Sequence, residues 1–392
     1  MKAERLPLPT NYAVAYAAKA CDVDVVAAYP ITPQSDIVER IAQFIADGEF
    51  NAEYIPVESE HSALSACIGA SATGARAFTA SCSQGLALMH ECLFIASACR
   101  LPIVMCVANR TLSAPINIHG DYQDSMSSRD CGWVQIFVSS AQEAYDAVIQ
   151  GYKLAELDGI LVPAMVCFDG YVLSHTYEPV FVYGDDDVKA FVPKRVKRIA
   201  NPDEPTTLGV LCLPNYEYEF KYQLVDALNR VPNTLRKVDK EFGEYFGRSY
   251  GLYETYRMDD AEYVIATMGA IASTSRILVD ELRQEGLKVG LFRPRLFRPC
   301  PADEWRKMLS KSELVLVVDR AICFGSTVGP LLSEILGVFM NEEERPVFSN
   351  FIAGIGGRDV TISDLRSMFR GAMESFRKKR VVKGCEYYGV RW

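Results

Sequence analysis

The sequence contains no CxxC motif, although it has 12 cysteines among its 392 residues. Iron–sulfur clusters and structural zinc sites usually take closely spaced cysteines, so this absence argues against either kind of site within the chain. The cysteines stand singly, mostly in apolar or small-residue segments such as those around Cys67, Cys99 and Cys106. We therefore expect buried free thiols in a reducing compartment, the cytoplasm.

An excess of positive charge is also missing. The chain has 41 Lys and Arg against 50 Asp and Glu, a net charge of -9. This balance argues against a broad surface for nucleic acid or anionic lipid. No apolar stretch is long enough for a signal peptide or a membrane span. The four histidines, which lack zinc-ligand spacing and an evident nucleophile partner, are expected to be structural: His61, His90, His119 and His175.

What the chain does have is a 49% hydrophobic content, which excludes a largely disordered protein. Short apolar runs alternate with segments of helical spacing from Thr10 to Phe168. This alternation predicts an α/β fold in which a parallel sheet carries helices on both faces. We assign this sheet and its connecting segment to a first domain, residues 1–240.

The end of that domain changes character. Three polar segments predict a surface connection. They are an acidic run at Gly184–Asp187, a basic run at Pro193–Lys197 and a turn-rich stretch at Asn201–Pro205. A helix over Tyr216–Val238 is expected to follow. Residues 241–392 then predict a smaller α/β domain with a basic, solvated tail at Arg377–Lys383.

Polar residues follow four of the predicted strands. In open α/β sheets, ligands bind beyond the carboxyl ends of the strands. A hydroxyl, a carboxylate, an amide and a guanidinium at one edge therefore predict a site for a small polar ligand. The four segments are Ile31-Thr32-Pro33, Glu58-Ser59-Glu60, Ser81-Cys82-Ser83-Gln84-Gly85 and Asn109-Arg110.

Each of these residues also has a purely structural interpretation. Thr32 precedes a proline and is in a typical turn position. Glu60 begins a helix, where a carboxylate commonly stabilises the helix dipole. Arg110 at a strand end is more often a surface or salt-bridge arginine. The functional interpretation rests on their occurrence together.

Considered together and in order, these segments resemble a known family. Five motifs are similar to those of the α subunit of pyruvate:ferredoxin oxidoreductases, within the 2-oxoacid:ferredoxin oxidoreductase family. They are Tyr29-Pro30-Ile31-Thr32-Pro33, Val57-Glu58-Ser59-Glu60-His61-Ser62-Ala63, Ser83-Gln84-Gly85-Leu86, Asn109-Arg110 and Asp121-Tyr122-Gln123-Asp124. Further resemblance at Arg129–Trp133, Phe168–Tyr171 and Ser174-His175, and a weaker one in the second domain, extends it over nearly the whole chain.

The resemblance implies a pyrimidine-type thiamin diphosphate-binding fold, followed by a smaller transketolase C-terminal-like domain. Glu60 would hold the ring nitrogen of the aminopyrimidine in its protonated state through a charge-assisted hydrogen bond. Arg110 would bind the substrate carboxylate and Thr32 would donate a hydroxyl hydrogen bond. The remaining residues that the resemblance places at the cofactor are Tyr29, Pro30, Ile31, Ser83 and Gln84.

A Gly-Asp-Gly motif, which commonly helps thiamin enzymes to hold magnesium and diphosphate, is missing. The nearest approximations, Phe168-Asp169-Gly170 and Gly184-Asp185-Asp186, do not fit. Partner subunits are therefore expected to complete the site. The resemblance places Mg²⁺, the diphosphate and one [4Fe-4S] cluster on a β subunit, further clusters on a ferredoxin-like δ subunit, and coenzyme A handling on a γ subunit.

The predicted reaction is the reversible oxidative decarboxylation of pyruvate to acetyl-CoA and CO2, with ferredoxin as electron acceptor. A branched-chain relative acting on 2-oxoisovalerate is the first alternative. An oxalate-type relative is disfavoured, because residues 29–36 lack the extra positive charge that a dianion needs. A non-catalytic scaffold subunit is the last alternative. The run Arg293-Pro294-Arg295 with Arg298-Pro299 has the charge to bind a phosphate-rich ligand such as coenzyme A. The favoured expectation is that these arginines make subunit contacts or lie in solvent.

Overall fold

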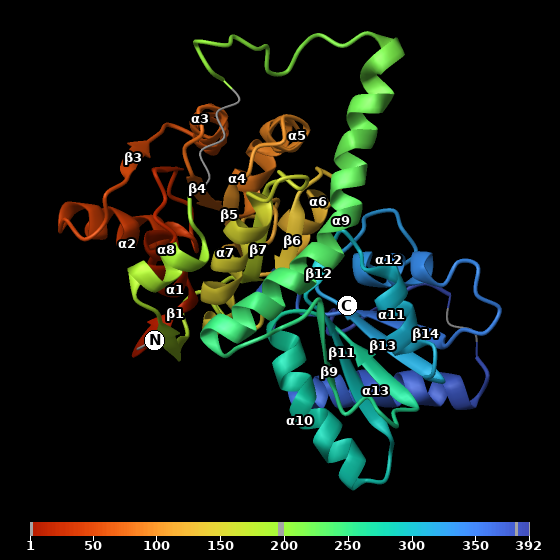
Figure 1. Ribbon diagram of the computed structural model, residues 1–392. Coiled ribbons are helices and arrows are strands. Elements are labelled where there is room, and N and C mark those ends of the chain that lie inside the picture. Colours follow the sequence, from red (N-terminus) through yellow and green to blue (C-terminus); the bar gives the residue numbers. More distant parts are fainter. Residues whose placement is uncertain (1–2, 195–199, 381–382, 392) are drawn as a thin grey trace.

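The first 250 residues contribute six strands to a seven-stranded sheet, and its seventh strand comes from residues 296–298. The computed structural model describes residues 3–194, 200–380 and 383–391 (Figure 1). The strand order is β12-β6-β7-β5-β4-β2-β3, and all pairs are parallel except β12 with β6. The strands are β2 (Val25–Ala28), β3 (Glu53–Pro56), β4 (Ala77–Ser81), β5 (Val104–Asn109), β6 (Val134–Phe137), β7 (Ala164–Asp169) and β12 (Leu296–Arg298).

Helices cover both faces of this sheet, as the alternation predicts. One face packs against α1 (Thr10–Ala20), α2 (Ser35–Ala46) and α7 (Ala141–Ala155), whose apolar side chains share one core with the strands. The other face carries α3 (Glu60–Ala72), α4 (Ser83–Leu88), α5 (His90–Ala98) and α6 (Gln123–Ser127). Two helices, α4 and α5, joined at Met89, connect β4 to β5.

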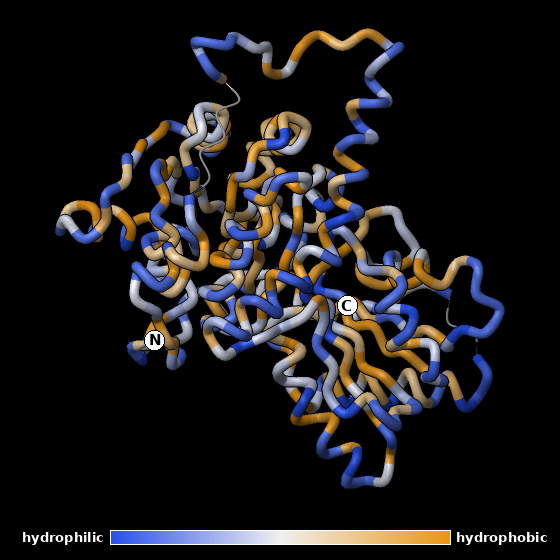
Figure 2. Tube along the Cα trace, in the orientation of Figure 1, coloured by the Kyte–Doolittle hydropathy of each residue, from blue (hydrophilic) through white to orange (hydrophobic). Residues whose placement is uncertain are grey.

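The second domain has a six-stranded sheet in the order β15-β14-β13-β10-β11-β9, parallel except for β9. Its strands are mainly hydrophobic (Figure 2). Helices α10 (Ala270–Gln284) and α13 (Ile362–Arg377) cover one face, while α11 (Ala302–Leu309) and α12 (Pro330–Val338) share a core with the first domain. The strands are β9 (Tyr253–Tyr256), β10 (Tyr263–Ala266), β11 (Val289–Pro294), β13 (Leu314–Asp319), β14 (Val347–Ile352) and β15 (Glu386–Tyr387).

The predicted surface connection contains more structure than its composition suggests. Strand β8 (Tyr177–Val182) pairs antiparallel with β1 (Glu4–Pro9). The acidic run opens helix α8 (Asp185–Phe191), where three aspartates in the first turn suit the helix dipole. The connection thus contains a helix that its composition did not predict. Most of the basic run, residues 195–197, lies outside the described residues.

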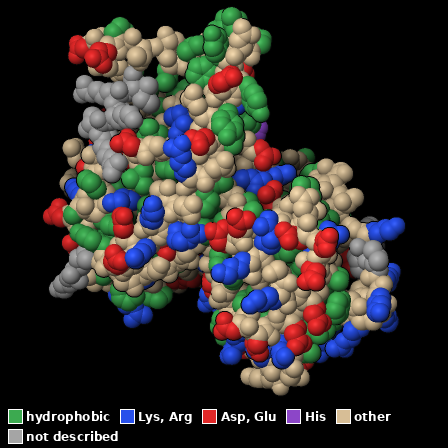
Figure 3. All heavy atoms as spheres, turned by 45° about the vertical axis from the view of Figure 1, so that its right-hand side comes forward, with side chains coloured by type: hydrophobic (Ala, Val, Ile, Leu, Met, Phe, Trp, Pro, Cys, Tyr) green, Lys and Arg blue, Asp and Glu red, His purple; other side chains and the backbone are tan. Residues whose placement is uncertain are grey.

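The connecting helix α9 (Pro214–Phe246) is longer than predicted and extends through residue 240. The domain boundary proposed at that residue thus falls inside the helix, and it stays a prediction. The amino-terminal part of α9 and the segment before it stand away from the body of the molecule (Figure 1). Hydrophobic side chains gather there in Figure 3. We call this segment the arm; its exposed hydrophobic residues are Val210, Leu211, Leu213, Tyr216, Tyr218, Phe220, Tyr222 and Val225.

Arg293 and Arg295 are buried, which contradicts the expectation that they contact solvent or other subunits. Both donate to Glu143 of α7, from Arg293 Nη2 at 3.1 Å and Arg295 Nε at 2.9 Å. Arg295 also donates to Gln150 at 2.7 Å. Although burial opposes ionisation, the two arginines lower the pKa of Glu143. Their partners lie some 150 positions away in the chain, so the sequence pattern did not indicate this buried contact between domains.

Replacing Glu143 by Ala is expected to destabilise the chain by about 3–5 kcal/mol, because it leaves the buried Arg295 without a carboxylate and Arg293 with only Glu254. The free energy of unfolding in urea measures the effect. The exposed Glu53→Ala variant serves as control and is expected to change stability by less than about 0.5 kcal/mol. Equal stabilities of the two variants would contradict the assigned role of Glu143.

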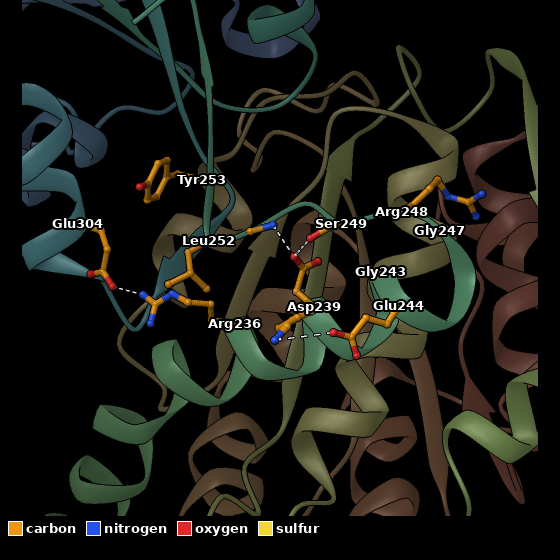
Figure 4. A pocket seen from close by; sticks show the side chains of 12 residues that line it. Arg236, Asp239, Gly243, Glu244, Gly247, Arg248, Ser249, Leu252, Tyr253 and Glu304 are labelled. Atoms are coloured by element: carbon orange, nitrogen blue, oxygen red, sulfur yellow. Dashed lines mark hydrogen bonds and ion pairs between the residues drawn. The ribbon is translucent and has the colours of Figure 1, made fainter. Parts of the chain in front are cut away.

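A cleft of about 640 Å³ lies where the end of α9 meets the second domain (Figure 4). Its charged side chains are paired with their neighbours: Arg236 contacts Glu304, and Lys240 lies 3.7 Å from Glu244. Asp239 accepts backbone N–H groups from Tyr250 at 2.9 Å and Gly251 at 2.8 Å. This cleft contains none of the predicted site residues.

Within the described residues, no helix combines the length and the apolar character needed to cross a bilayer.

Candidate functional site

The candidate site lies where the order of the first sheet reverses. The chain runs from β2 outward to β3 and then returns to the other side of β2 as β4. A crevice therefore opens between the loops that follow β2 and β4, which is where open α/β sheets bind ligands. Thr32 follows β2, and Cys82 and Gly85 follow β4.

Two hydrogen bonds connect the residues that follow β4 and β5 to the loop that follows β2. Arg110 Nη1, from the end of β5, donates to the carbonyl oxygen of Thr32 at 3.0 Å. Cys82 Sγ donates to the same oxygen at 3.2 Å. Tyr29, Pro30 and Thr32 are exposed, with 38% of the Tyr29 surface accessible, so this loop forms the open side of the site.

Glu60 is the first residue of α3 and is only 6% exposed. The Ser59 side chain caps the helix by accepting the backbone N–H of Ser62 at 3.2 Å. Among the described residues, no cation forms an ion pair with the Glu60 carboxylate, and burial raises its pKa. A buried carboxyl group of this kind gains most from a ligand that donates a hydrogen bond to it.

Gly85 leaves the space that the Glu60 carboxyl group uses. A Cβ atom at residue 85 would lie 2.5 Å from Glu60 Oε1 and 2.5 Å from Ser81 Oγ, closer than real contacts allow. The Ser81 Oγ and Gln84 Nε2 atoms are buried and have no hydrogen-bond partner among the described residues. Buried polar atoms without partners are unusual. A polar ligand bound at this end of β4 would supply the missing hydrogen bonds.

Arg110 is 5% exposed and, among the described residues, has no carboxylate within salt-bridge distance. Its Nε donates to the carbonyl oxygen of Asn117 at 2.9 Å, and Nη1 uses one proton for Thr32. Because a guanidinium has five N–H donors, three stay available. A buried, unneutralised guanidinium with free donors is suited to binding a carboxylate.

Asp124, the last residue of the Asp121-Tyr122-Gln123-Asp124 motif, connects the ends of β4 and β5. Its Oδ2 accepts the backbone N–H of Ser83 at 2.8 Å and of Arg110 at 2.9 Å, and its Oδ1 accepts Asn109 Nδ2 at 2.7 Å. Burial raises the pKa of Asp124 to about 6, although these donors oppose the shift. In the sequence, Asp124 is marked only as a carboxylate 14 residues after Arg110 in a polar loop.

Ser83, predicted to contact the cofactor, is largely engaged within the chain. It is buried, has a φ of 51°, and its hydroxyl donates to the Thr111 carbonyl. Ile31 is partly buried and donates its N–H to Gln34 Oε1 at 3.3 Å. The direct cofactor contacts of both residues stay predictions.

The two approximations to Gly-Asp-Gly have other structural roles. Asp169 accepts the Tyr122 hydroxyl at 2.8 Å and the backbone N–H of Ala270 at 2.8 Å, and it forms an ion pair with Arg320. Asp185 belongs to α8 and lies 2.9 Å from Lys19. Residues 3–194, 200–380 and 383–391 contain no cluster of three or more potential metal-ligating side chains.

Two family models match the chain. Residues 16–240 match "Pyruvate flavodoxin/ferredoxin oxidoreductase, thiamine diP-bdg", and residues 261–365 match "Pyruvate:ferredoxin oxidoreductase core domain II". The chain belongs to this oxidoreductase family. The resemblance seen in the motifs is thereby confirmed, as is the thiamin diphosphate-binding α/β fold.

Similar family members include pyruvate synthase subunit PorA of Methanocaldococcus jannaschii, 49% identical over 91% of this chain and 92% of the relative. PorA of Thermotoga maritima is 46% identical over 94% of this chain and 95% of the relative. Ketoisovalerate oxidoreductase subunit VorA of Pyrococcus abyssi is 44% identical over 97% of this chain and 96% of the relative.

Solved structures agree with the fold. The 2-oxoglutarate:ferredoxin oxidoreductase of Magnetococcus marinus superposes with a TM-score of 0.73 at 18% identity, covering 95% of this chain and 65% of that chain. A split-gene transketolase superposes with a TM-score of 0.54 at 13% identity, covering 94% of this chain and 99% of the other. At these identities the likeness concerns the fold.

Proposed function

We propose that this chain is the α subunit of a pyruvate:ferredoxin oxidoreductase, a pyruvate synthase acting reversibly between pyruvate and acetyl-CoA plus CO2. One observation carries the proposal: a buried carboxyl group without a cation, Glu60, and a buried guanidinium without a carboxylate, Arg110, adjoin the same topological switch point. A scaffold subunit has no chemical need for this pair. Identities of 42–49% to PorA subunits support the same reaction.

In this proposal, the chain binds the aminopyrimidine side of thiamin diphosphate. When bound, thiamin diphosphate supplies the carbon nucleophile that attacks a 2-oxoacid carbonyl. Glu60 holds a proton at the pyrimidine ring nitrogen, and its low exposure strengthens that hydrogen bond. The unpartnered Gln84 Nε2 and Ser81 Oγ are further hydrogen-bonding groups for the ring. The absence of a side chain at Gly85 lets the Glu60 carboxyl group lie close to Ser81 Oγ.

Arg110 binds the substrate carboxylate through its free N–H donors, and the Thr32 hydroxyl donates to the substrate from the exposed loop. The backbone of that loop is fixed by the bond from Arg110 Nη1 to the Thr32 carbonyl. The same guanidinium therefore orients both the loop and the substrate. Positioning of this kind accelerates a reaction because the reacting groups are already held in place.

Partner subunits complete the site in this proposal. A β subunit holds Mg²⁺, the diphosphate and a [4Fe-4S] cluster, while γ and δ subunits handle coenzyme A and electron transfer to ferredoxin. The exposed loop around Thr32 and the hydrophobic arm are surfaces that such partners would cover. We place the complex in the cytoplasm, since all twelve cysteines are free thiols.

Pyruvate is favoured over 2-oxoisovalerate as the substrate. PorA relatives reach 49% identity, whereas VorA relatives reach 44%. Side-chain selectivity depends on the apolar walls of the pocket, where one methylene changes discrimination by about 1–3 kcal/mol.

Purification of the complex through a tag on this chain tests the proposal. Mass spectrometry should identify the partner subunits. Ferredoxin reduction with coenzyme A should be fastest with pyruvate among pyruvate, 2-oxoisovalerate, 2-oxoglutarate and oxalate. A chain that purifies alone, or a complex that prefers another oxoacid, would overturn it.

A further inference from the structure

The loop that follows Arg110 connects this residue to the second domain. The loop closes on itself, since the Thr111 N–H donates to the His119 carbonyl at 3.1 Å. Within it, the Asn117 carbonyl oxygen accepts Arg110 Nε at 2.9 Å. The Asn117 side chain in turn donates from Nδ2 to the Gly356 carbonyl at 2.9 Å. One residue thus contacts both the guanidinium and the second domain.

Gly356 belongs to a glycine-rich turn, Gly354–Gly357, that follows β14. Its φ is 62°, and a Cβ there would lie 2.8 Å from Asn117 Nδ2, so only glycine permits this contact. The Gly356 N–H donates to Asp121 Oδ2 at 2.9 Å. The turn is therefore hydrogen-bonded to the loop at two residues, Asn117 and Asp121.

The other atoms of the Asn117 side chain are also engaged. Its Oδ1 accepts the backbone N–H of His119 at 2.9 Å. A Cβ at Gly357 would lie 2.2 Å from His119 Cβ, so the turn also packs closely against this part of the loop. The loop is held from both sides, which fixes the carbonyl oxygen that Arg110 Nε uses.

We propose that Asn117 is a positioning residue for Arg110, through which the glycine-rich turn of the second domain orients the substrate-binding guanidinium. Nε has a single proton, and the bond to Asn117 uses it, so the plane of the guanidinium is set by the loop. The second domain thereby takes part in substrate binding without touching the substrate. The inference rests on the proposed role of Arg110 and extends it.

Asn117→Ala in the assembled complex tests the proposal. The KM for pyruvate is expected to rise about fivefold to tenfold, because the variant loses the hydrogen bond to Gly356 that positions the Arg110 guanidinium. The inhibition constant of oxamate, which carries the same carboxylate, is expected to rise in parallel. The affinity for thiamin diphosphate should stay unchanged, because Glu60 and Gly85 lie outside this loop.

The matched control is Asn233→Ala. Asn233 is an exposed residue of α9 that also makes a side-chain hydrogen bond, accepting from Arg236 at 2.8 Å. It should leave all three constants unchanged. Gly356→Ala disturbs the same contact from the second domain and should raise the KM for pyruvate in the same way. The KM of the double variant should not exceed that of the more affected single variant.

A purely structural role would lower kcat or the yield of complex without changing the KM or the oxamate constant. That pattern in Asn117→Ala would overturn the inference while leaving the proposed function intact, provided that the wild-type complex oxidises pyruvate. If the Gly356→Ala chain does not assemble into the complex, the KM and oxamate constant of Asn117→Ala alone test the positioning role. A wild-type complex without activity on any oxoacid would instead contradict the proposed function.

Discussion

Turnover by the assembled complex is expected to fall by about 10²–10⁴-fold when Glu60 is replaced by Gln, the range typical of a group that controls a proton in the reaction. The amide cannot hold a proton at the pyrimidine nitrogen as a carboxylate does. Pyruvate-dependent ferredoxin reduction at saturating thiamin diphosphate measures the loss. The exposed Glu53→Gln variant, on the strand that leads to α3, should keep normal turnover.

A second measurement locates the defect. Exchange of the thiazolium C2 proton for deuterium, followed after acid quenching without substrate, should slow to the same degree in Glu60→Gln. Gly85→Ala should reproduce part of this effect, because its Cβ displaces the Glu60 carboxyl group. Near-normal exchange and turnover in Glu60→Gln would show that another group activates the cofactor.

Replacement of Arg110 by Met is expected to lower kcat/KM for pyruvate by about 100-fold or more, equivalent to at least about 2.7 kcal/mol. The variant removes the charge-assisted hydrogen bonds to the substrate carboxylate and also frees the Thr32 loop. Arg110→Lys should be intermediate, since an ammonium lacks the planar, bidentate geometry.

The thiazolium exchange rate distinguishes Arg110 from Glu60. It should stay normal in Arg110→Met, because this arginine contacts the substrate and not the pyrimidine in the proposed arrangement. Arg370→Met, at an exposed position of α13, is the matched control. Slow exchange in Arg110→Met would mean that the arginine holds the site together rather than binding the substrate.

Much of the first domain was predictable because its elements are marked locally. Buried strands such as Val104–Asn109 are short apolar runs, and helices such as Ser35–Ala46 have apolar residues on one face. Ser59 followed by Glu60 is typical of a capped helix start. The parallel order of the sheet follows from this alternation.

The missed features depend on residues far apart in the chain. Strand β12 lies in the second half of the sequence but joins the first sheet through β6, at Leu296 and Ile136. The burial of Arg295 depends on Glu143, and neither residue reveals the other locally. Helix α13 was missed although Thr361 and Asp364 form a capping box at its start.

At the site, the sequence indicated which residues meet but not what holds them. Thr32, Glu60 and Arg110 follow the parallel strands β2, β3 and β5, so parallel topology alone brings them to one edge. The Asp124 carboxylate accepts the backbone N–H groups of Ser83 and Arg110, and the Asn117 carbonyl oxygen accepts Arg110 Nε. Their geometry appears only once the chain is folded.

The core that α11 and α12 share with the first domain predicts that the chain unfolds as a single cooperative unit. Phe137 of β6 packs edge-on against Phe297 of β12 at 5.8 Å, and that core continues to Trp305. Cutting the chain near residue 240 would leave β6 as an open edge and Glu143 without its arginines. The two halves should therefore melt together in calorimetry, and neither should be recovered folded when produced separately.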